Sequence, residues 1–388
     1  GDFQNPRLYF DDNKLTEDKS SGNESLLTFG SVMSKYINDK RGGWSEKRYE
    51  AQVSKLNYFL AYAQEIDELS GEIRTLDSTS SSDARNYKEH LQGVPTNATK
   101  LFPDHSPRET VRKAQEQDLN ILSLTTQNNY LQVLSSLYSF ATKELDYEGK
   151  NPFEGRAETK AAGKLQRDQR DPFSQKQLET LFSSPLYTGC KTLPSCHLPG
   201  PLIPNNSHKY WTPLIALLTG MRMQEILQLH LEDIYQKEGI WVLDLNTNHH
   251  DKRLKSPQSK RLVPLHKKLV ELGFLKFVED KRAASNSPRL FDDAKLANDN
   301  TYSSTFSKWF SRHLEKLGIK TDKTSFHSLR HNLKDSFREA GESDELAENF
   351  MGRSTGSTGE AYGSGFSIKK QHQAINKIKF NQIIIRDS

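Results

Sequence analysis

The chain has 388 residues, of which 34% are hydrophobic and 27% are charged, and its net charge is +4. This length favours two or three domains, each with a core of its own. No apolar run approaches the roughly 20 residues that span a bilayer, and the first residues lack the basic start and apolar run of a secretory signal. The two cysteines, Cys190 and Cys196, are too few for a disulfide framework. We therefore expect a soluble, cytoplasmic protein with no membrane partner, and the weakly basic charge permits nucleic-acid binding without requiring it.

The first part of the chain reads as a polar lead-in followed by a helical domain. Residues 1–24 are poorly patterned, and we expect them to be mobile. Residues 25–153 contain apolar side chains at helical spacing, with a further helix expected around residues 83–91. The clearest repeats are Tyr49, Val53, Leu56 and Leu60, and then Tyr130, Leu134, Leu137 and Ala141. Asn151 and Pro152 break the pattern and end this domain.

Residues 154–172 are polar and charged, and we interpret them as an interdomain linker. A second domain, residues 173–388, opens with Ser174 and Gln177 at the spacing of a capping box. Its helical stretch at residues 211–220 ends at Gly220, and residues 221–234 follow that break.

Short buried strands are expected at residues 239–245 and 261–265, joined by the polar connection 246–260. Further helices are expected at residues 301–317, 325–340 and 343–351. The predicted fold class is mainly α with a small antiparallel sheet.

Residues 324–341, "TSFHSLRHNLKDSFREAG", combine an apolar stripe with His327, Arg330 and His331 near the start of a helix. Such a cluster has three interpretations. It can be a solvated surface helix, or an anion site formed by the helix N-terminus and a two-pronged arginine. It can also be a metal site, but the stretch lacks the glutamate of an H-E-x-x-H motif and places an arginine beside the two histidines.

The rest of the second domain supplies partners for an anion site. "TGMRMQE" carries Arg222 with Glu225 one turn later, and the connection carries Lys255. "ENFMGRSTGSTGEAYGSG" carries Arg353 and, nine residues on, Tyr362. This set, in this order, resembles the tyrosine recombinase (phage integrase) family. That family has an arginine with a following acidic residue, a hairpin lysine, H-x-x-R, and a tyrosine nine residues after a histidine. The helical domain that ends in "NNYLQVLSSLYSFATKELDYEGKNPFEG" is similar to the family's core-binding domain.

The resemblance implies a site-specific recombinase that cuts and rejoins DNA through a 3′-phosphotyrosyl intermediate. Two arginines suit the non-bridging oxygens of a phosphodiester and the charge that grows there in the transition state. Tyr362 is the expected nucleophile and His327 the expected base, because an imidazole titrates near neutral pH. The family implies that Lys255 protonates the departing 5′ oxygen. The expected catalytic residues are Arg222, Lys255, His327, Arg330, Arg353 and Tyr362, supported by Glu225 and His331.

Since the phosphotyrosyl bond stores the energy of the cut bond, we expect no cofactor and no metal. The expected partners are double-stranded DNA, further copies of the chain in a tetramer on paired sites, and accessory DNA-bending proteins. Arg353 departs from the family, which has His or Trp at that position. A catalytically weakened DNA-binding relative and a type IB topoisomerase are therefore alternatives.

Several residues keep a second interpretation. Lys252 and Lys260 are alternatives to Lys255, and the whole connection can be a solvated basic loop. Zinc binding is the weaker reading of Cys190, Cys196, His197 and His208, because their spacing fits no standard pattern. His249 and His250 read as loop residues without a role. The apolar tail either docks on a neighbouring copy or packs on its own domain, and it comprises Ile375, Ile378, Phe380, Ile383, Ile384 and Ile385.

Overall fold

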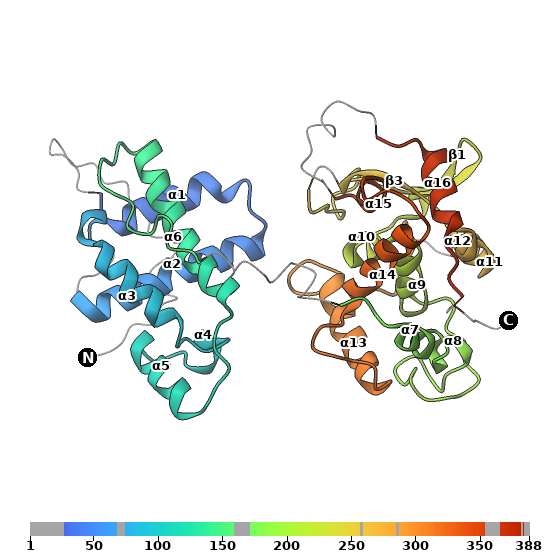
Figure 1. Ribbon diagram of the computed structural model, residues 1–388, viewed down its shortest axis with the longest axis horizontal. Helices are drawn as coiled ribbons and strands as arrows, with labels where there is room; N and C mark the ends of the chain where they lie inside the picture. Colours follow the sequence, from blue (N-terminus) through green and yellow to red (C-terminus); the bar gives the residue numbers. More distant parts are fainter. Residues whose placement is uncertain are drawn as a thin grey trace. The chain divides into compact units, whose positions relative to one another are not determined.

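The computed structural model of the chain consists of two compact units, residues 1–162 and residues 163–388 (Figure 1). Each unit has a hydrophobic core of its own. In the part of the chain that the structure describes, no helix is both long and apolar enough to cross a membrane. The described residues are 27–67, 74–158, 171–256, 259–284, 287–353, 365–381 and 383.

The first unit is a bundle of helices. Its members are α1 (Phe29–Arg41), α2 (Glu46–Asp67), α3 (Ser81–Leu91), α4 (Ala98–Leu101), α5 (Pro107–Glu116) and α6 (Leu124–Glu144), with a 3₁₀ turn at Leu76–Ser78. The long α6 packs against α1, α2 and α3. Its predicted apolar stripe forms the centre of the core, because Leu134, Leu137 and Ala141 are fully buried. Ser80 and Asp83 form a capping box that starts α3.

The second unit carries helices around a small sheet. The helices are α7 (Gln175–Phe182), α8 (Pro185–Thr188), α9 (His208–Thr219), α10 (Met223–Leu227), α11 (Lys267–Glu271), α12 (Phe274–Ala284), α13 (Ser303–Lys316), α14 (Phe326–Glu339), α15 (Asp344–Met351) and α16 (Ile368–Lys377). Ser174 and Gln177 make the expected capping box of α7. The apolar α9 is buried along nearly its whole length and packs against α14, which makes this pair the framework of the unit.

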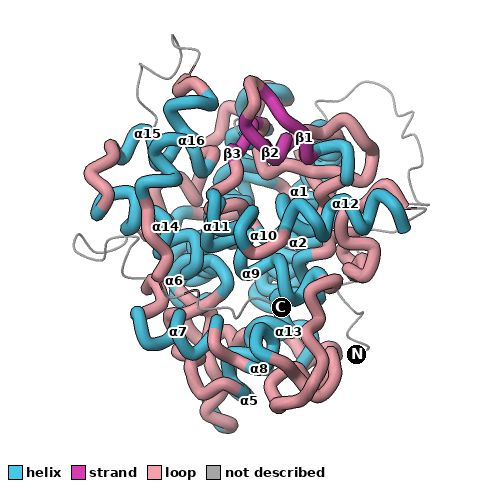
Figure 2. Tube along the Cα trace, turned by 90° about the vertical axis from the view of Figure 1, so that its right-hand side faces the viewer, coloured by secondary structure: helices cyan, strands magenta, loops and turns pink. Residues whose placement is uncertain are grey.

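The sheet consists of β1 (Ile234–Lys237), β2 (Ile240–Leu245) and β3 (Arg261–Pro264), in the order β1-β2-β3. Both pairings are antiparallel, with Tyr235 opposite Val242 and Leu243 opposite Val263. Glu238 and Gly239 both have positive φ, as a tight two-residue hairpin turn requires. Figure 2 shows the three strands side by side in a molecule made mostly of helices. The predicted fold class, mainly α with a small antiparallel sheet, is confirmed.

The structure settles two parts of the second unit that the sequence pattern left open. Residues 221–234 contain only the short α10, followed by a 3₁₀ turn at Leu231–Asp233 and the start of β1. The apolar tail packs on its own unit, since Ile375, Ile378, Phe380 and Ile383 are buried in its core. Ile384 and Ile385 lie outside the described residues. Within the described tail, the buried residues are therefore not available to a neighbouring copy.

Candidate active site

Arg222 is positioned by the sharp end of α9. Gly220 caps that helix with a left-handed backbone (φ 62°), and a Cβ at this position would lie 2.8 Å from Leu333 and 2.9 Å from Met351. Only glycine meets both conditions without strain. The chain therefore turns within two residues and places Arg222 at the start of α10.

Glu225 is the buried carboxylate of the site. It accepts hydrogen bonds from the Arg222 backbone N–H (2.9 Å), from Arg222 Nη1 (2.7 Å) and from Arg261 Nη2 (3.1 Å). Burial by itself raises the pKa of Glu225, but the charges and hydrogen bonds of Arg261 and Arg222 outweigh it and lower the pKa. Glu225 is thus an ionised carboxylate that binds two arginines. An ordinary helical ion pair would join it to Arg222 alone.

Arg330 lies in the first turns of α14 and is only 2% exposed. Its guanidinium donates to the backbone oxygens of Gly220 and Met351. Its Nε is buried and has no hydrogen-bond partner among the described residues. Burial, followed by the charges of Arg261, Arg353 and Arg222, lowers the pKa of Arg330 to about 8. Arg330 is therefore a desolvated cation among other cations, and one of its three side-chain nitrogens, Nε, is unpaired among the described residues.

Arg261, at the start of β3, belongs to the same cluster, although the sequence pattern predicted only a strand there. Its Nε donates to the Phe350 oxygen (3.0 Å), while Arg222 Nη2 donates to the Gly352 oxygen (3.1 Å). With the bond from Arg330 to Met351, three arginines hold three successive carbonyls at the end of α15. This end directly precedes residues 354–364.

Tyr362, the predicted nucleophile, lies within residues 354–364 and so outside the described part of the chain. Arg353 is the last described residue before it. The Arg353 Nε lies 3.7 Å from Glu348 Oε2, and its backbone N–H donates to the Glu348 oxygen (2.9 Å). The structure thus places Arg353 beside the arginine cluster, since its charge acts on Arg330.

The lysines of the connection between β2 and β3 differ in their surroundings. Lys255 and Lys260 are exposed. Lys252 is buried, and its Nζ lies 2.6 Å and 2.7 Å from the two carboxylate oxygens of Asp233. Because a buried ion pair of this kind is costly to break, Lys252 is bound in place and does not suit a proton donor to DNA.

His327 and His331 lie one turn apart on α14, both half-buried, with ring centroids 6.4 Å apart. In the described part of the chain, the side chains that come together as a group of metal-ligand type lie elsewhere, at His230, Glu232 and His249. The zinc interpretation of the cysteine region gains no support either. His208 Nδ1 is bound to Asp293 (2.8 Å), and the Cys196 sulfur faces His313 Nδ1 at 3.7 Å.

The described part of the site is therefore suited to bind an anion. Arg222 and Arg261 pair with the carboxylate of Glu225, and their charges and that of Arg353 act on the buried Arg330. Arg353 lies beside Glu348, which also binds Lys334. A buried excess of positive charge is stabilised when an anion enters. Arginine forks suit the oxygens of a phosphate.

Comparisons with known proteins agree with this geometry. A sequence model of the phage integrase family matches residues 203–364, whereas no curated protein sequence matches the chain. Two solved structures of λ integrase share the fold. The dimer of residues 75–356 bound to a COC′ core site has a TM-score of 0.52 at 12% identity, covering 88% of this chain and all of the other. The tetramer bound to a Holliday junction has a TM-score of 0.51 at 13% identity, covering 87% and 78%. The Tn1549 transposon integrase, residues 82–397, in complex with circular intermediate DNA has a TM-score of 0.51 at 17% identity, covering 90% and 98%.

Proposed function

We propose that this chain, whose residues 203–364 match the phage integrase family, is a tyrosine recombinase that cuts and rejoins DNA at specific sites through Tyr362. The observation that carries the proposal is the buried arginine cluster, with the unused Nε of Arg330 at its centre. A DNA phosphodiester carries one negative charge and two non-bridging oxygens. Its negative charge would balance the excess positive charge of the arginine cluster.

The chemistry assigned to these residues is a transesterification. The Tyr362 oxygen attacks the phosphorus and gives up its proton to His327, while the bond from phosphorus to the 5′ oxygen breaks. Lys255 gives a proton to that oxygen, so the products are a 3′-phosphotyrosyl bond and a free 5′-hydroxyl. Rejoining is the same reaction run backwards by a 5′-hydroxyl from another strand, and it consumes no cofactor.

Arg222 and Arg330 stabilise the charge that grows on the phosphate oxygens. The described contacts of Arg222 use three of its five N–H donors, on Glu225, Ser259 and Gly352. Glu225 and Arg261 keep that guanidinium in place, which is the positioning that such catalysis needs.

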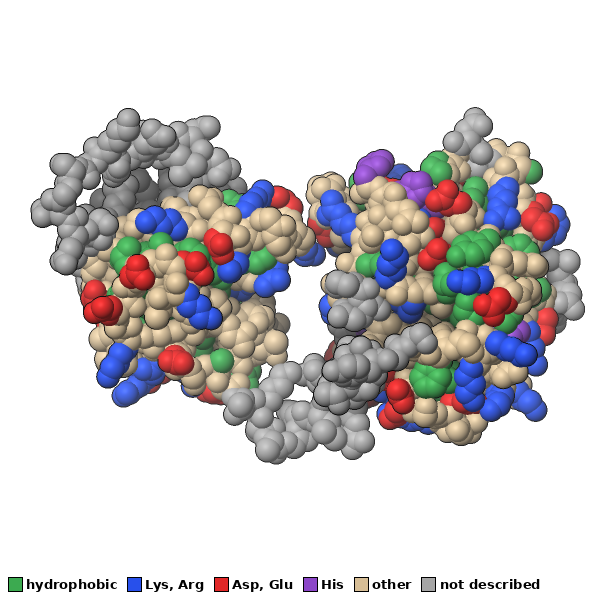
Figure 3. All heavy atoms as spheres, turned by 90° about the horizontal axis from the view of Figure 1, so that it is seen from above, with side chains coloured by type: hydrophobic (Ala, Val, Ile, Leu, Met, Phe, Trp, Pro, Cys, Tyr) green, Lys and Arg blue, Asp and Glu red, His purple; other side chains and the backbone are tan. Residues whose placement is uncertain are grey.

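The partner in this proposal is double-stranded DNA, and the working form is a tetramer on paired sites. λ integrase has been seen as a dimer on a core site and as a tetramer on a Holliday junction, which supports both points for this chain. Figure 3 shows that the visible face of each unit carries both basic and acidic side chains. On this face, binding is therefore expected to depend on particular contacts and not on a uniformly basic surface. Accessory DNA-bending proteins belong to the same proposal.

Strand exchange between two plasmids tests the function. Each plasmid carries one copy of a candidate attachment site, and control plasmids carry a scrambled site. We expect joined products only when both sites are intact. Relaxation of supercoils on every plasmid, without joined products, would instead identify a type IB topoisomerase. DNA binding without either product would identify a recombinase-like binding protein.

A further inference from the structure

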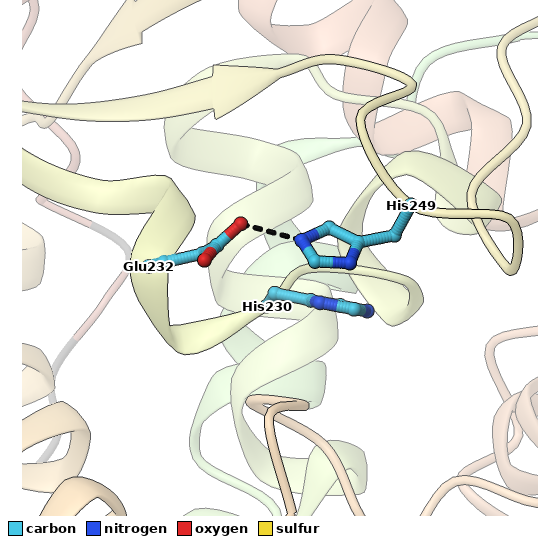
Figure 4. A group of neighbouring side chains, drawn as sticks. All are labelled: His230, Glu232 and His249. Atoms are coloured by element: carbon cyan, nitrogen blue, oxygen red, sulfur yellow. Dashed lines mark hydrogen bonds and ion pairs between the residues drawn. The ribbon is translucent and has the colours of Figure 1, made fainter.

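His230, Glu232 and His249 form a cluster that the proposed reaction does not use. His230 precedes the 3₁₀ turn Leu231–Asp233, Glu232 lies within that turn, and His249 lies in the connection between β2 and β3. One ligand atom of each residue lies within 4.8 Å of those of the other two. Figure 4 shows the His230 ring beneath the ring of His249, with the Glu232 carboxylate beside them. The ring centroids of the two histidines are 4.4 Å apart.

His230 is a buried histidine with one ring nitrogen near a carboxylate and the other unpaired among the described residues. The residue is 2% exposed, and its Nε2 lies 3.0 Å from Asp251 Oδ2. Its Nδ1 is buried and has no hydrogen-bond partner within the described ranges. A histidine that gives one nitrogen to a carboxylate and leaves the other unoccupied has the arrangement seen at metal sites, where the carboxylate fixes the tautomer and the ring orientation.

His249 and Glu232 supply the other two donors. His249 Nε2 lies 2.5 Å from Glu232 Oε1, and this hydrogen bond lowers the pKa of Glu232. Both side chains are partly exposed, at 36% and 62%, so they are free to adjust. Tetrahedral zinc, with bonds of about 2.0–2.2 Å to nitrogen and oxygen, places its ligand atoms about 3.3–3.6 Å apart. Movements of about an ångström are enough to reach that spacing from the present one.

We propose that His230, Glu232 and His249 bind a divalent transition metal, best Zn²⁺, with water as the fourth ligand. Two imidazoles and one carboxylate favour zinc over magnesium or calcium, which prefer all-oxygen sites. The metal replaces the proton that His249 Nε2 shares with Glu232. None of the three ligands is assigned to the phosphoryl chemistry, so the metal has no part in that reaction.

The consequence is a cross-link between two segments of the second unit. His230 and Glu232 belong to the turn before β1, whereas His249 opens the connection that also carries Lys255. A bound metal ties the start of this connection to the turn. It therefore stabilises the folded unit by binding it in preference to the unfolded chain.

Zinc titration of the full, untagged chain tests the site. The protein is first freed of metal with a chelator, and Zn²⁺ uptake is then measured by competition with a coloured chelator. We expect one Zn²⁺ per chain, a visible absorption band when Co²⁺ is used instead, and a rise in Tm with added Zn²⁺. None of these measurements depends on recombination. A chain that binds no zinc can therefore be told apart from a chain that does not recombine DNA.

The matched variants are His249→Ala and His250→Ala, two neighbouring histidines of which His250 is exposed and outside the cluster. We expect His249→Ala to weaken zinc binding by about 100-fold or more, and Asp251→Asn, which alters the partner of His230, by about 10–100-fold. His250→Ala binds as the unaltered protein does. Equal binding by the two alanine variants, or no zinc uptake by the unaltered chain at micromolar metal, would overturn the proposal.

Discussion

Arg330 is a buried cation whose closest charged neighbours are mostly other cations. Burial and the neighbouring cations lower the pKa of Arg330, which means that the folded site disfavours the bare charge. Folding therefore bears a cost for burying this cation. An anion in the site offsets that cost.

The first prediction is anion binding by the arginine cluster. Millimolar phosphate should raise the Tm of the DNA-free protein, and should raise that of Arg330→Lys much less, because lysine keeps the charge but lacks the planar two-pronged donor. The measurement is thermal unfolding, with sodium chloride at equal ionic strength as the control. An equal effect of phosphate on both proteins would show that Arg330 is not the group that binds the anion.

Arg353 adds a further positive charge at the position that the family resemblance predicts for a His or Trp. Its charge contributes to the low pKa of Arg330, and its guanidinium lies near Glu348. Arginine donates hydrogen bonds to a phosphate but cannot accept a proton. We expect Arg353→His to raise the rate of cleavage by about 10-fold or more, as one restored catalytic contact would.

That rate is measured as single-turnover formation of the covalent protein–DNA adduct, with DNA affinity determined alongside. The two proteins are compared at matched occupancy of the DNA. An equal or slower His variant would mean that Arg353 is a working member of the site.

At the scale of elements, the site depends on how β3 meets the end of α15. Arg261 links the two, because it binds both Glu225 and the Phe350 carbonyl. Gly352 has a left-handed backbone (φ 64°), and a Cβ there would lie 2.5 Å from Arg261 Nη1. The arginine therefore occupies the space beside the glycine that ends α15, directly before the segment with Tyr362.

Arg261→Lys keeps the charge but loses the planar fork that reaches two partners at once. We expect cleavage to slow by about 10–100-fold, as a misplaced reacting group would, while DNA affinity changes little. Hydrogen exchange at residues 350–353 should become faster. Arg253→Lys, an exposed arginine of the connection, is the control and should leave both readouts unchanged. A variant at Arg261 with normal cleavage would remove this residue from the site.

Local signals in the sequence predicted local structure well. The capping box of Ser174 and Gln177 and the break at Gly220 depend on neighbours in the chain, and both were confirmed. Arg261 was missed because its partners are 36 and 89 residues away, at Glu225 and Phe350. The strand β1 was missed because it has only four residues, Ile234–Lys237, which is too short for an alternation of apolar and polar side chains to be recognised.

The fold class and the family resemblance were also confirmed, since both follow from patterns spread over many residues. The roles of the individual site residues remain predictions. From the sequence, His249 was interpreted as a loop residue without a role. Its partner Glu232 lies 17 residues earlier in the chain, and nothing in the neighbouring sequence indicates that the two side chains meet.

At the scale of the whole molecule, the reaction proposed for this chain on duplex DNA needs no metal. Cleavage should therefore proceed in EDTA, although the chelator removes any zinc bound at His230 and His249. The measurement is covalent adduct formation with and without EDTA. Activity that is lost to the chelator and restored by magnesium would overturn the assignment of the reaction to Tyr362 and its neighbours.

The most direct test of the central claim is to trap the covalent intermediate and locate it. The protein reacts with a suicide substrate, a nicked candidate attachment site whose 5′-hydroxyl fragment diffuses away, and the adduct is digested and mapped by mass spectrometry. We predict a DNA-linked peptide modified at Tyr362. We also predict that Tyr362→Phe binds the same DNA with nearly unchanged affinity and forms no adduct. A normal amount of adduct from the Phe variant, or a link at another residue, would contradict the account.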